Sequence, residues 1–315
     1  MNKPLIQTID LVKHFDTNSG VVHAVDHVDL SINEGETLGV VGESGCGKST
    51  LGRCILNLIP ATSGEILYDG KSIFSRAGRK NFRQNMQIIF QDPYSSLDPR
   101  MTVFNLIAEP LKVTRQCSRA EMKERVESIM DTVGLAPRLT NAYPHELDGG
   151  RRQRIGVARA LVMNPKFVVC DEPVSALDVS IQAQILNLMM DVQEKSGITY
   201  MFITHDLSVV KHISHSIAVM YLGQVVELAP KEELFSHPCH PYTKALLAAV
   251  PIPDASRRHM KRQLIKGEVT SPIDPDPGCR FASRCPYATA ECVAGDLPMQ
   301  EISPGHQIRC CHPLV

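Results

Sequence analysis

Short, almost wholly apolar runs recur along this chain and alternate with stretches in which apolar residues return every three or four positions. The apolar runs predict strands covered on both faces, and the longer spacing predicts helices with one buried side. Predicted strands are 38–41, 86–90, 167–170, 201–204 and 217–221. Predicted helices are 119–133 and 180–194, and Gly197 is placed to end the second. This alternation indicates an α/β fold with a largely parallel sheet.

The pattern changes after about residue 230, where prolines crowd the chain and periodic stretches become rare. Loop-rich sequence of this kind predicts a separate, smaller region. We therefore expect a main domain over residues 1–235 and an extension over 236–315.

The charge balance and hydropathy exclude several classes of protein. Lys and Arg (33) nearly equal Asp and Glu (34), which gives no electrostatic case for nucleic-acid binding. No apolar run reaches the ~18 residues of a membrane helix, and the first residues contain no signal-peptide core. The sequence predicts a soluble protein, or one held at a membrane through a partner.

Residues 42–50 have the most specific chemistry in the chain. Between an apolar run and a helical stretch, they form the glycine-rich pattern of a phosphate-binding loop. The glycines let backbone N–H groups point inward, and the helix that follows places its positive end against an anion. Lys48 is expected to reach the β- and γ-phosphates, and Ser49 to ligate Mg²⁺. The predicted nucleotide contacts here are Gly42, Glu43, Ser44, Gly45, Cys46, Gly47, Lys48, Ser49 and Thr50.

Two carboxylates, Asp171 and Glu172, follow the predicted strand 167–170, in the Walker B arrangement. Asp171 is predicted to hold Mg²⁺ through water, and Glu172 to activate the attacking water as a general base or by orienting it. Taken alone, such a pair is more typical of a helix cap, and the phosphate loop is what favours catalysis. Gln91 and His205 also end predicted strands, where Gln91 could contact Mg²⁺ and water and His205 the γ-phosphate.

The order of these motifs resembles the ATP-binding subunits of ABC transporters over roughly residues 5–230. Three further stretches share in the resemblance, Leu-Asp-Gly-Gly-Arg at 147–151, Ser-Ala-Leu-Asp at 175–178 and Thr-His-Asp at 204–206. The resemblance implies a RecA-like P-loop core with an antiparallel β patch and a helical lobe at about 93–160.

The same resemblance implies ATP and Mg²⁺ as ligands and a head-to-tail dimer. Each ATP would lie between one subunit's phosphate loop and the other's signature, which is 147–151 here. The implied contacts from the opposite subunit are Asp148, Gly149, Gly150 and Asp178. Phe15 matches the aromatic position that stacks on adenine, and its alternative is a core position in the β patch.

Asp148 departs from the family pattern, which has serine at this position. That serine donates to the γ-phosphate of the opposite subunit's nucleotide, and a carboxylate cannot donate unless protonated. Two like charges about 4 Å apart repel by about 4 kcal/mol at an effective dielectric near 20. One hypothesis is therefore a weakened ATP site and an asymmetric dimer. The alternative is that Asp148 turns away or is screened by Arg151 or Arg152.

Residues 91–100 and 237–247 resemble, more narrowly, the ATP-binding subunits of oligopeptide and dipeptide permeases, and residues 267–279 continue the likeness. The resemblance is strongest to the second, F-type, of the two ATPases in these permeases. The implied function is ATP hydrolysis that powers peptide import, at the cytoplasmic face of the cell membrane. The implied partners are a sister ATPase, two membrane subunits and an external peptide-binding protein.

Residues 92–110 and 143–146 would contact the membrane subunits, although both could be ordinary surface loops. Alternative functions are the ATPase of a nickel permease of the same architecture, a soluble ABC ATPase acting on DNA or ribosomes, and a metal-containing regulator that uses ATP as a signal.

Six of the ten cysteines lie in the extension. A disulfide framework would be unusual in a cytosolic ATPase, so metal binding is favoured. The predicted ligands are Cys279, Cys285, Cys292 and Cys310, with Cys311 as an alternative fourth. Related permease ATPases carry this pattern, and some hold a [4Fe–4S] cluster there. Four thiolates also suit structural Zn²⁺, although zinc sites more often have short C-x₂-C pairs.

Overall fold

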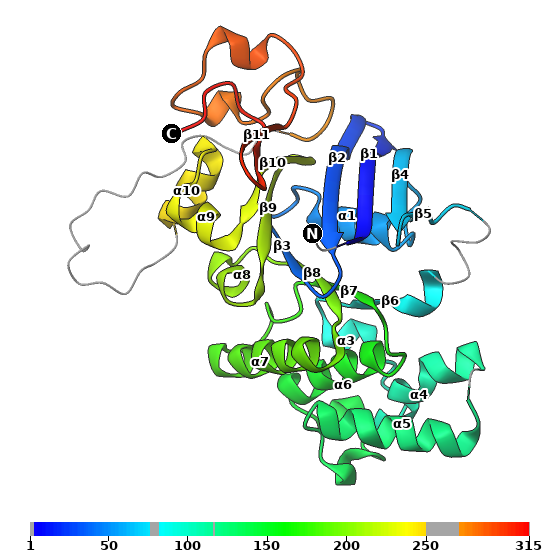
Figure 1. Cartoon of the computed structure of the whole chain (residues 1–315). Helices are drawn as coiled ribbons and strands as arrows, with labels where there is room; N and C mark the ends of the chain where they lie inside the picture. The colour runs from blue at the N-terminus through cyan, green and yellow to red at the C-terminus, as the bar shows by residue number, and fades with distance from the viewer. Residues whose placement is uncertain (1–2, 76–81, 116, 250–270, 315) are drawn as a thin grey trace, which may run out of the picture. The chain divides into compact units, whose positions relative to one another are not determined.

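The structure is a computed structural model that describes residues 3–75, 82–115, 117–249 and 271–314 (Figure 1). The chain divides into two compact units. Unit 1 consists of Met1–Gln7, Ser31–Glu36 and Ile66–Ile203, and unit 2 of Thr8–Leu30, Thr37–Glu65 and Thr204–Val315. Each unit is assembled from distant parts of the sequence. The predicted boundary near residue 235 stays a prediction, because both of its sides belong to unit 2.

Three long strands contribute residues to both units: β1 (Pro4–Thr17), β2 (Gly20–Asn33) and β4 (Ser63–Tyr68). With the short strand β5 (Lys71–Ser72) they form a four-stranded sheet in the order β2-β1-β4-β5. The pair β4–β5 is antiparallel, as the predicted β patch requires.

Three parallel strands form the sheet of unit 1, in the order β8-β7-β6. They are β6 (Met86–Ile89), β7 (Phe167–Asp171) and β8 (Thr199–Ile203). Every residue of β7 and β8 is buried, which explains why both are apolar in the sequence except at Asp171 and Thr199. The strands predicted at 86–90, 167–170 and 201–204 are confirmed, with ends shifted by up to two residues.

Unit 1 contains the helices α3 (Pro93–Ser96), α4 (Val103–Thr114), α5 (Arg119–Thr132), α6 (Gly149–Leu161) and α7 (Val179–Ser196). Of these helices, α4 to α7 each bury part of their surface. Helix α6 packs against α3, α4 and β6. The two predicted helices are confirmed as α5 and α7, and Gly197 closes α7 in a left-handed conformation at φ 68°.

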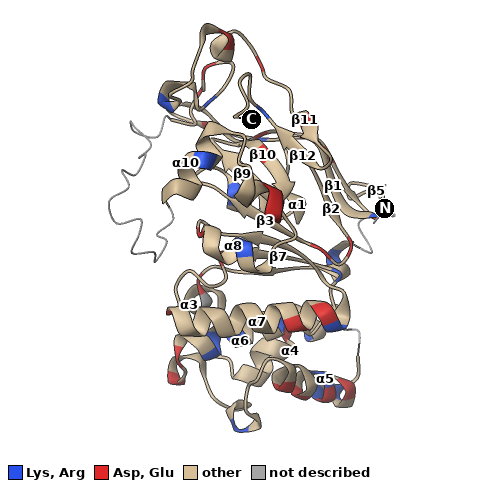
Figure 2. Ribbon diagram, turned by 60° about the vertical axis from the view of Figure 1, so that its left-hand side comes forward, with Lys and Arg blue, Asp and Glu red and all other residues tan. Residues whose placement is uncertain are grey.

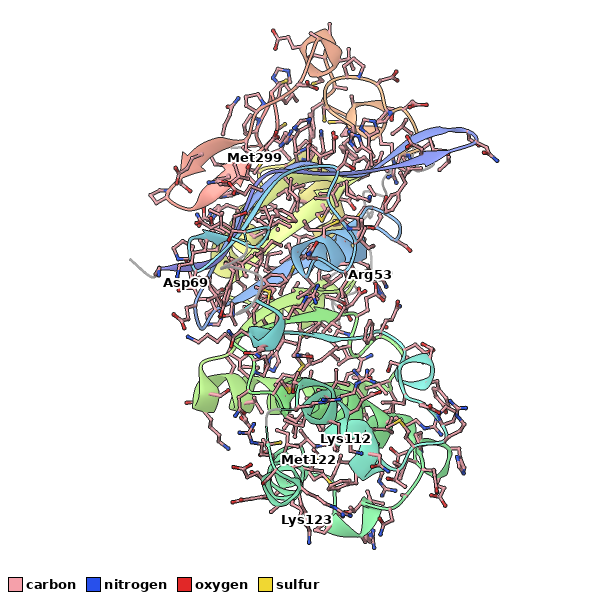
Figure 3. All side chains as sticks on the ribbon, turned by 90° about the vertical axis from the view of Figure 1, so that its right-hand side faces the viewer. Arg53, Asp69, Lys112, Met122, Lys123 and Met299 are labelled. Atoms are coloured by element: carbon pink, nitrogen blue, oxygen red, sulfur yellow. The ribbon has the colours of Figure 1, made fainter. Side chains whose placement is uncertain are left out.

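The polar side of α5 carries charges of both signs, seen as alternating blue and red in Figure 2. Lys123 lies on this side and pairs with Glu127 at 3.7 Å, whereas its neighbour Met122 is half-buried; both are labelled in Figure 3. Mixed charges of this kind favour a solvated helix face over a nucleic-acid surface.

Unit 2 contains a five-stranded sheet in the order β11-β12-β10-β9-β3. Its strands are β3 (Thr37–Val41), β9 (Ser216–Tyr221), β10 (Gln224–Pro230), β11 (Gln300–Ser303) and β12 (His306–Ile308). The pair β3–β9 is parallel, and β10 is antiparallel to both β9 and β12. Thus the strands predicted at 38–41 and 217–221 are confirmed, and the extension adds two strands to the sheet that carries the phosphate loop.

The remaining helices of unit 2 are α1 (Lys48–Ile55), α8 (Leu207–Ile213), α9 (Lys231–Ser236) and α10 (Pro241–Ala249). Two short 3-10 turns, Ala282–Arg284 and Ala290–Val293, lie in the otherwise loop-rich extension. None of the helices in the described part of the chain is long and apolar enough to span a membrane.

The extension shares a hydrophobic core with the main sheet of unit 2. Tyr221 of β9, Tyr242 of α10 and Phe281 are fully or almost fully buried. Their ring centroids are 4.7 to 5.4 Å apart, in tilted and edge-to-face arrangements that suit aromatic pairs. The extension therefore packs against the sheet of unit 2 and is not an independent domain on a linker.

Candidate functional site

The phosphate loop connects β3 to α1, in the strand–loop–helix setting that the sequence predicts. Two of its glycines are required by close backbone contacts at positive φ. At Gly42 (φ 154°) a Cβ atom would lie 2.2 Å from the Met220 carbonyl oxygen, and at Gly47 (φ 105°) 1.9 Å from that of Ala24. No other residue fits at either position without moving the neighbouring strand.

Lys48 begins α1 and is 5% exposed. Its ammonium group donates to the carbonyl oxygens of Gly42 at 2.8 Å and Glu43 at 2.9 Å, so its charge lies directly against the loop. Cys46 is also buried, and burial raises the pKa of its thiol. The thiol is therefore a neutral packing group, as expected for a cysteine without a chemical role.

Two further predicted contacts belong to unit 2 with the loop. Phe15 of β1 is 36% exposed, with Lys13 Nζ 4.7 Å from its ring centroid, so it is not a buried core residue of the β patch. Adenine stacking on its exposed face stays a prediction. Thr204 N–H donates to Val40 O at 3.1 Å, which places the exposed His205 just beyond the end of β3, where the loop begins.

The carboxylates follow β7 in unit 1. Asp171 is 2% exposed, whereas Glu172 leaves the strand with a left-handed backbone at φ 47°. This conformation costs a non-glycine residue about 1–3 kcal/mol and occurs preferentially at functional sites. Glu172 N–H donates to Ile203 O at 3.0 Å, and Gln91 Nε2 donates to Glu172 Oε2 at 2.9 Å. Two predicted catalytic side chains, Gln91 and Glu172, are thus in direct contact.

The signature segment lies at the beginning of α6, and Asp148 is its N-cap. Asp148 Oδ1 accepts from Arg151 N–H at 2.8 Å, and Oδ2 lies 3.4 Å from Arg151 Nε. The carboxylate therefore performs the capping role that a serine would also perform, and Arg151 partly offsets its charge. Arg152 is buried and donates to Pro144 O at 2.6 Å instead.

Asp178 plays the same part at α7. It accepts from Ile181 N–H at 3.1 Å and from the Ser180 hydroxyl at 2.8 Å, and the Ser180 hydrogen bond lowers the pKa of Asp178. Asp178 is therefore the N-cap of α7, and its contact with the opposite subunit's nucleotide stays a prediction.

The predicted nucleotide residues thus form two sets, one in each unit. Unit 2 holds Phe15, His205 and the phosphate loop. Unit 1 holds Gln91, Asp171, Glu172, Asp178 and the signature residues Asp148, Gly149 and Gly150.

Five of the six cysteines of the extension line one cavity of unit 2, together with His240, Phe281 and His312. These cysteines are Cys279, Cys285, Cys292, Cys310 and Cys311, all present as free thiols. Burial, together with the charges of neighbouring cysteines, raises the pKa of Cys279 and Cys310 to about 11. The structure therefore brings together the four predicted ligands and the alternative fourth.

Three charged contacts that the sequence analysis missed attach the extension to unit 2. Asp26 pairs with Arg280, and Glu43 pairs with Arg284. The fully buried Glu227 of β10 accepts from His306 Nε2 and from the N–H groups of Cys239 and His240. The sequence does contain a sign that Glu227 is a buried contact, because it is the only acidic residue in a largely apolar strand. Nothing in the local sequence distinguishes Asp26, Arg280 or Arg284 from ordinary surface charges.

Two groups of side chains elsewhere have potential metal-ligand atoms within 4.8 Å of one another: His14, His23 and Asp26, and Glu227, Cys239 and His306. In both groups the carboxylate already accepts hydrogen bonds from the protein. These contacts account for the proximity without a metal ion.

Comparisons with known proteins agree with this description. A family profile described as "ABC transporter" matches residues 25–175, and one described as "Oligopeptide/dipeptide transporter, C-terminal region" matches residues 226–292. The chain is 50% identical to the oligopeptide transport ATP-binding protein OppF of Salmonella typhimurium, over 98% of this chain and 96% of that protein. It is 47% identical to the oligopeptide transport ATP-binding protein AppF of Bacillus subtilis, over 97% and 96%.

Solved structures confirm the predicted fold class. CbiO1 of Clostridium perfringens, part of the ABC transporter complex cbiONQ, matches with a TM-score of 0.66 and 29% identity, over 74% of this chain and 91% of that one. The ATP-binding cassette MJ0796, in a dimeric post-hydrolysis state bound to ADP and Pi, matches with a TM-score of 0.64 and 28% identity, over 72% and 98%. The chain therefore belongs to the ATP-hydrolysing subunits of ABC transporters, within the group of the oligopeptide transport ATP-binding proteins.

Proposed function

We propose that this chain hydrolyses ATP to power the import of oligopeptides or dipeptides through a membrane transporter. The observation that carries the proposal is that one chain contains both a phosphate-binding loop and the side chains that would activate water. The chain contains a glycine-rich loop with Lys48, and a Glu172 carboxylate that accepts a hydrogen bond from Gln91. It also contains a C-terminal region that matches the peptide-transporter profile. The near full-length match to oligopeptide relatives favours peptides over nickel, and transport over a soluble role.

In this mechanism, the loop N–H groups and Lys48 bind the β- and γ-phosphates of ATP. Ser49, Gln91 and Asp171 would hold Mg²⁺, which neutralises phosphate charge when bound. Glu172 polarises the water that attacks the γ-phosphorus in line, and the products are ADP and phosphate. The Gln91 amide fixes the Glu172 carboxylate in one orientation through its 2.9 Å hydrogen bond, and His205 contacts the γ-phosphate.

The second subunit of the active dimer is a sister ATPase in this proposal. Asp148, Gly149, Gly150 and Asp178 would act on the nucleotide bound to the sister's phosphate loop. Because Asp148 replaces a hydroxyl donor by a carboxylate, the ATP site completed by this chain would turn over more slowly than the site on its own loop.

The membrane subunits would dock on a groove in unit 1, beside the 91–100 segment. Phe90, Pro110 and Val113 line this groove, and the side chains of Phe90 and Val113 are 37% and 77% exposed. Exposed apolar groups in a concave surface support docking of a short segment from a partner. This chain would then lie on the cytoplasmic face of the membrane, with a peptide-binding protein on the opposite side.

The cysteine-lined cavity would hold a [4Fe–4S] cluster, with Zn²⁺ as the alternative. Its donor set fits either group, because five thiols face one cavity. An unpartnered polar group in the lining of the cavity fits either metal group. His240 Nδ1 accepts from Tyr242 N–H at 3.1 Å, so the proton of the neutral ring is on Nε2, and burial lowers the pKa of this ring to about 3. That Nε2 is buried without a hydrogen-bond partner among the described residues.

A buried N–H beside anionic sulfur is a typical outer partner of a metal–thiolate group. Cys279, Cys285 and Cys292, with Cys310 or Cys311, would be the ligands, and the group would staple a segment that has little core of its own. Iron, sulfide and zinc analysis of protein purified without oxygen distinguishes the two metals, and protein free of all three would contradict the assignment.

The activity is tested with a Glu172→Gln variant in a complex assembled with the sister ATPase and the membrane subunits. We expect loss of peptide-stimulated ATP hydrolysis with ATP binding retained, because the amide cannot polarise water. Glu194→Gln, an exposed carboxylate of α7, is the matched control and should retain hydrolysis. Hydrolysis retained by Glu172→Gln would place the base elsewhere, and stimulation by nickel in place of peptide would favour the metal permease.

A further inference from the structure

Three different contacts meet at Glu43, the second residue of the phosphate loop. Its N–H donates to the Tyr242 hydroxyl at 3.0 Å, and its carbonyl oxygen accepts from Lys48 Nζ at 2.9 Å. Its carboxylate accepts a two-pronged pair of hydrogen bonds from Arg284, at 2.9 Å and 3.3 Å. Backbone and side chain of one loop residue are thus held by two residues of the extension and by the phosphate-binding lysine.

The Arg284 contact is well shielded from solvent. The side chain of Arg284 is 7% exposed, and that of Glu43 is 24% exposed. Burial disfavours the charged guanidinium, but hydrogen bonds to Glu43 and to the Tyr221 hydroxyl outweigh it and raise the pKa of Arg284. A forked, charge-assisted pair of this kind fixes direction as well as distance, so it restrains the Glu43 side chain to one position.

Tyr242 reaches Glu43 from a rigid base. It is fully buried, and its ring packs against Tyr221 at 4.7 Å and against Phe281 at 5.3 Å. Phe281 and Arg284 lie in the stretch between Cys279 and Cys285, two of the cavity-lining cysteines. The same short segment therefore borders the cysteine cavity on one side and contacts the phosphate loop on the other.

We propose that Tyr242 and Arg284 are positioning residues for ATP binding, which set the conformation of the phosphate loop through Glu43. Without these two contacts, the first residues of the loop would not be held in one conformation. Part of the free energy of ATP binding would then be spent on ordering the loop. The proposal deepens the proposed function, and its core does not depend on which metal, if any, occupies the cysteine cavity.

Coupling between two sites is reciprocal, so ATP must in turn stabilise the segment that holds the loop. Binding of Mg-ATP should slow amide hydrogen exchange in residues 279–285, far along the chain from the loop. This readout separates a positioning role from general structural support, since a merely structural residue would not make exchange there depend on nucleotide.

The test uses the full chain with Tyr242→Phe, Arg284→Gln and the conservative Arg284→Lys. The dissociation constant for Mg-ATP should rise roughly two- to tenfold for Tyr242→Phe and roughly tenfold or more for Arg284→Gln, in proportion to the hydrogen bonds removed. Arg284→Lys keeps the charge and should recover part of the loss. In the assembled transporter, the KM for ATP should rise while kcat stays within about twofold, because Glu172 is untouched.

Arg309→Gln is the matched control: Arg309 belongs to the extension and donates to His27 O at 3.1 Å. It should weaken nucleotide binding less than twofold. In a Glu43→Gln background, Arg284→Gln should have little further effect, because both changes remove the same contact. The proposal is overturned if Tyr242→Phe and Arg284→Gln match the control in affinity, or if ATP leaves exchange in 279–285 unchanged. Normal ATP affinity without ATP hydrolysis in the unmodified assembled complex would instead contradict the proposed function.

Discussion

The strands of unit 1 and the extension of unit 2 are held in place by different kinds of interaction. Strands β7 and β8 consist of buried residues on both faces, and apolar side chains fill almost every position. The extension adds charged contacts to its aromatic packing, and Asp26, Glu43 and Glu227 each accept hydrogen bonds from it. A segment too poor in apolar residues to build a core can still be fixed, provided that directional polar contacts replace buried area.

The difference has a physical consequence. Apolar packing tolerates replacement by side chains of similar volume, whereas a buried carboxylate that loses its partners leaves unsatisfied donors behind. Unit 1 should therefore be sensitive to the size of side chains, and the attachment of the extension to their hydrogen-bonding capacity.

The largest loss of stability is expected in the apolar sheet. Phe202 of β8 is fully buried, so Phe202→Ala should destabilise the protein by about 3–5 kcal/mol through lost burial and a cavity. Val113→Ala, at a side chain that is 77% exposed, is the control and should have little effect. Urea denaturation checks both, and equal midpoints for the two variants would contradict the buried role of Phe202.

A smaller loss is expected when the carboxylate of β10 becomes an amide. Glu227→Gln keeps the shape but removes charge and one acceptor, at a cost of about 1–3 kcal/mol. Limited proteolysis should cut residues 271–314 faster in this variant, while the rest of the chain resists. Glu232→Gln, at a side chain that is 85% exposed, should behave as the unmodified protein does. Equal resistance of both variants would show that apolar contacts alone hold the extension.

Acid should weaken the same attachment through Asp26. Burial opposes its ionisation, but Arg280 and hydrogen bonds from His14 and Gln224 outweigh this and lower its pKa below the ordinary value of 3.8. A carboxyl whose folded pKa is depressed stabilises the fold above its unfolded pKa, and this contribution is lost as the pH falls through the folded value. Protection of the extension against hydrogen exchange, relative to the unfolded chain at the same pH, should therefore fall as the pH drops below about 3.8. Asp26→Asn should abolish that dependence, and its persistence would assign it to another group.

The smallest effect on stability is expected at an exposed carboxylate, which sharpens the contrast with the buried ones. Asp148→Ser should change stability by less than about 0.5 kcal/mol, because both residues are good N-caps. Its effect on activity should be larger, since ATP hydrolysis by the assembled complex rises when a donor replaces the carboxylate. Unchanged hydrolysis would remove the hypothesis of an asymmetric dimer and leave Arg151 as sufficient screening.

The sequence predicted the parts of the molecule in which local pattern and chemistry coincide. The phosphate loop, the carboxylates after β7 and the helix end at Gly197 are short-range features whose residue types are required by their backbone or their ligands. The contacts of the extension could not be predicted in the same way. Arg284 and Glu43 are 241 residues apart, and neither is unusual in its own segment.

The pairing of β12 with β10 also bears on how the chain is made. When only residues 1–300 have been synthesised, β10 lacks its antiparallel neighbour β12. An unpaired strand edge of this kind can pair with other chains. Because β12 is synthesised last of the strands, a product that ends before it would carry an unpaired sheet edge on β10. A shortened copy would thus tend to be removed by the cell before it could occupy a place in a transporter.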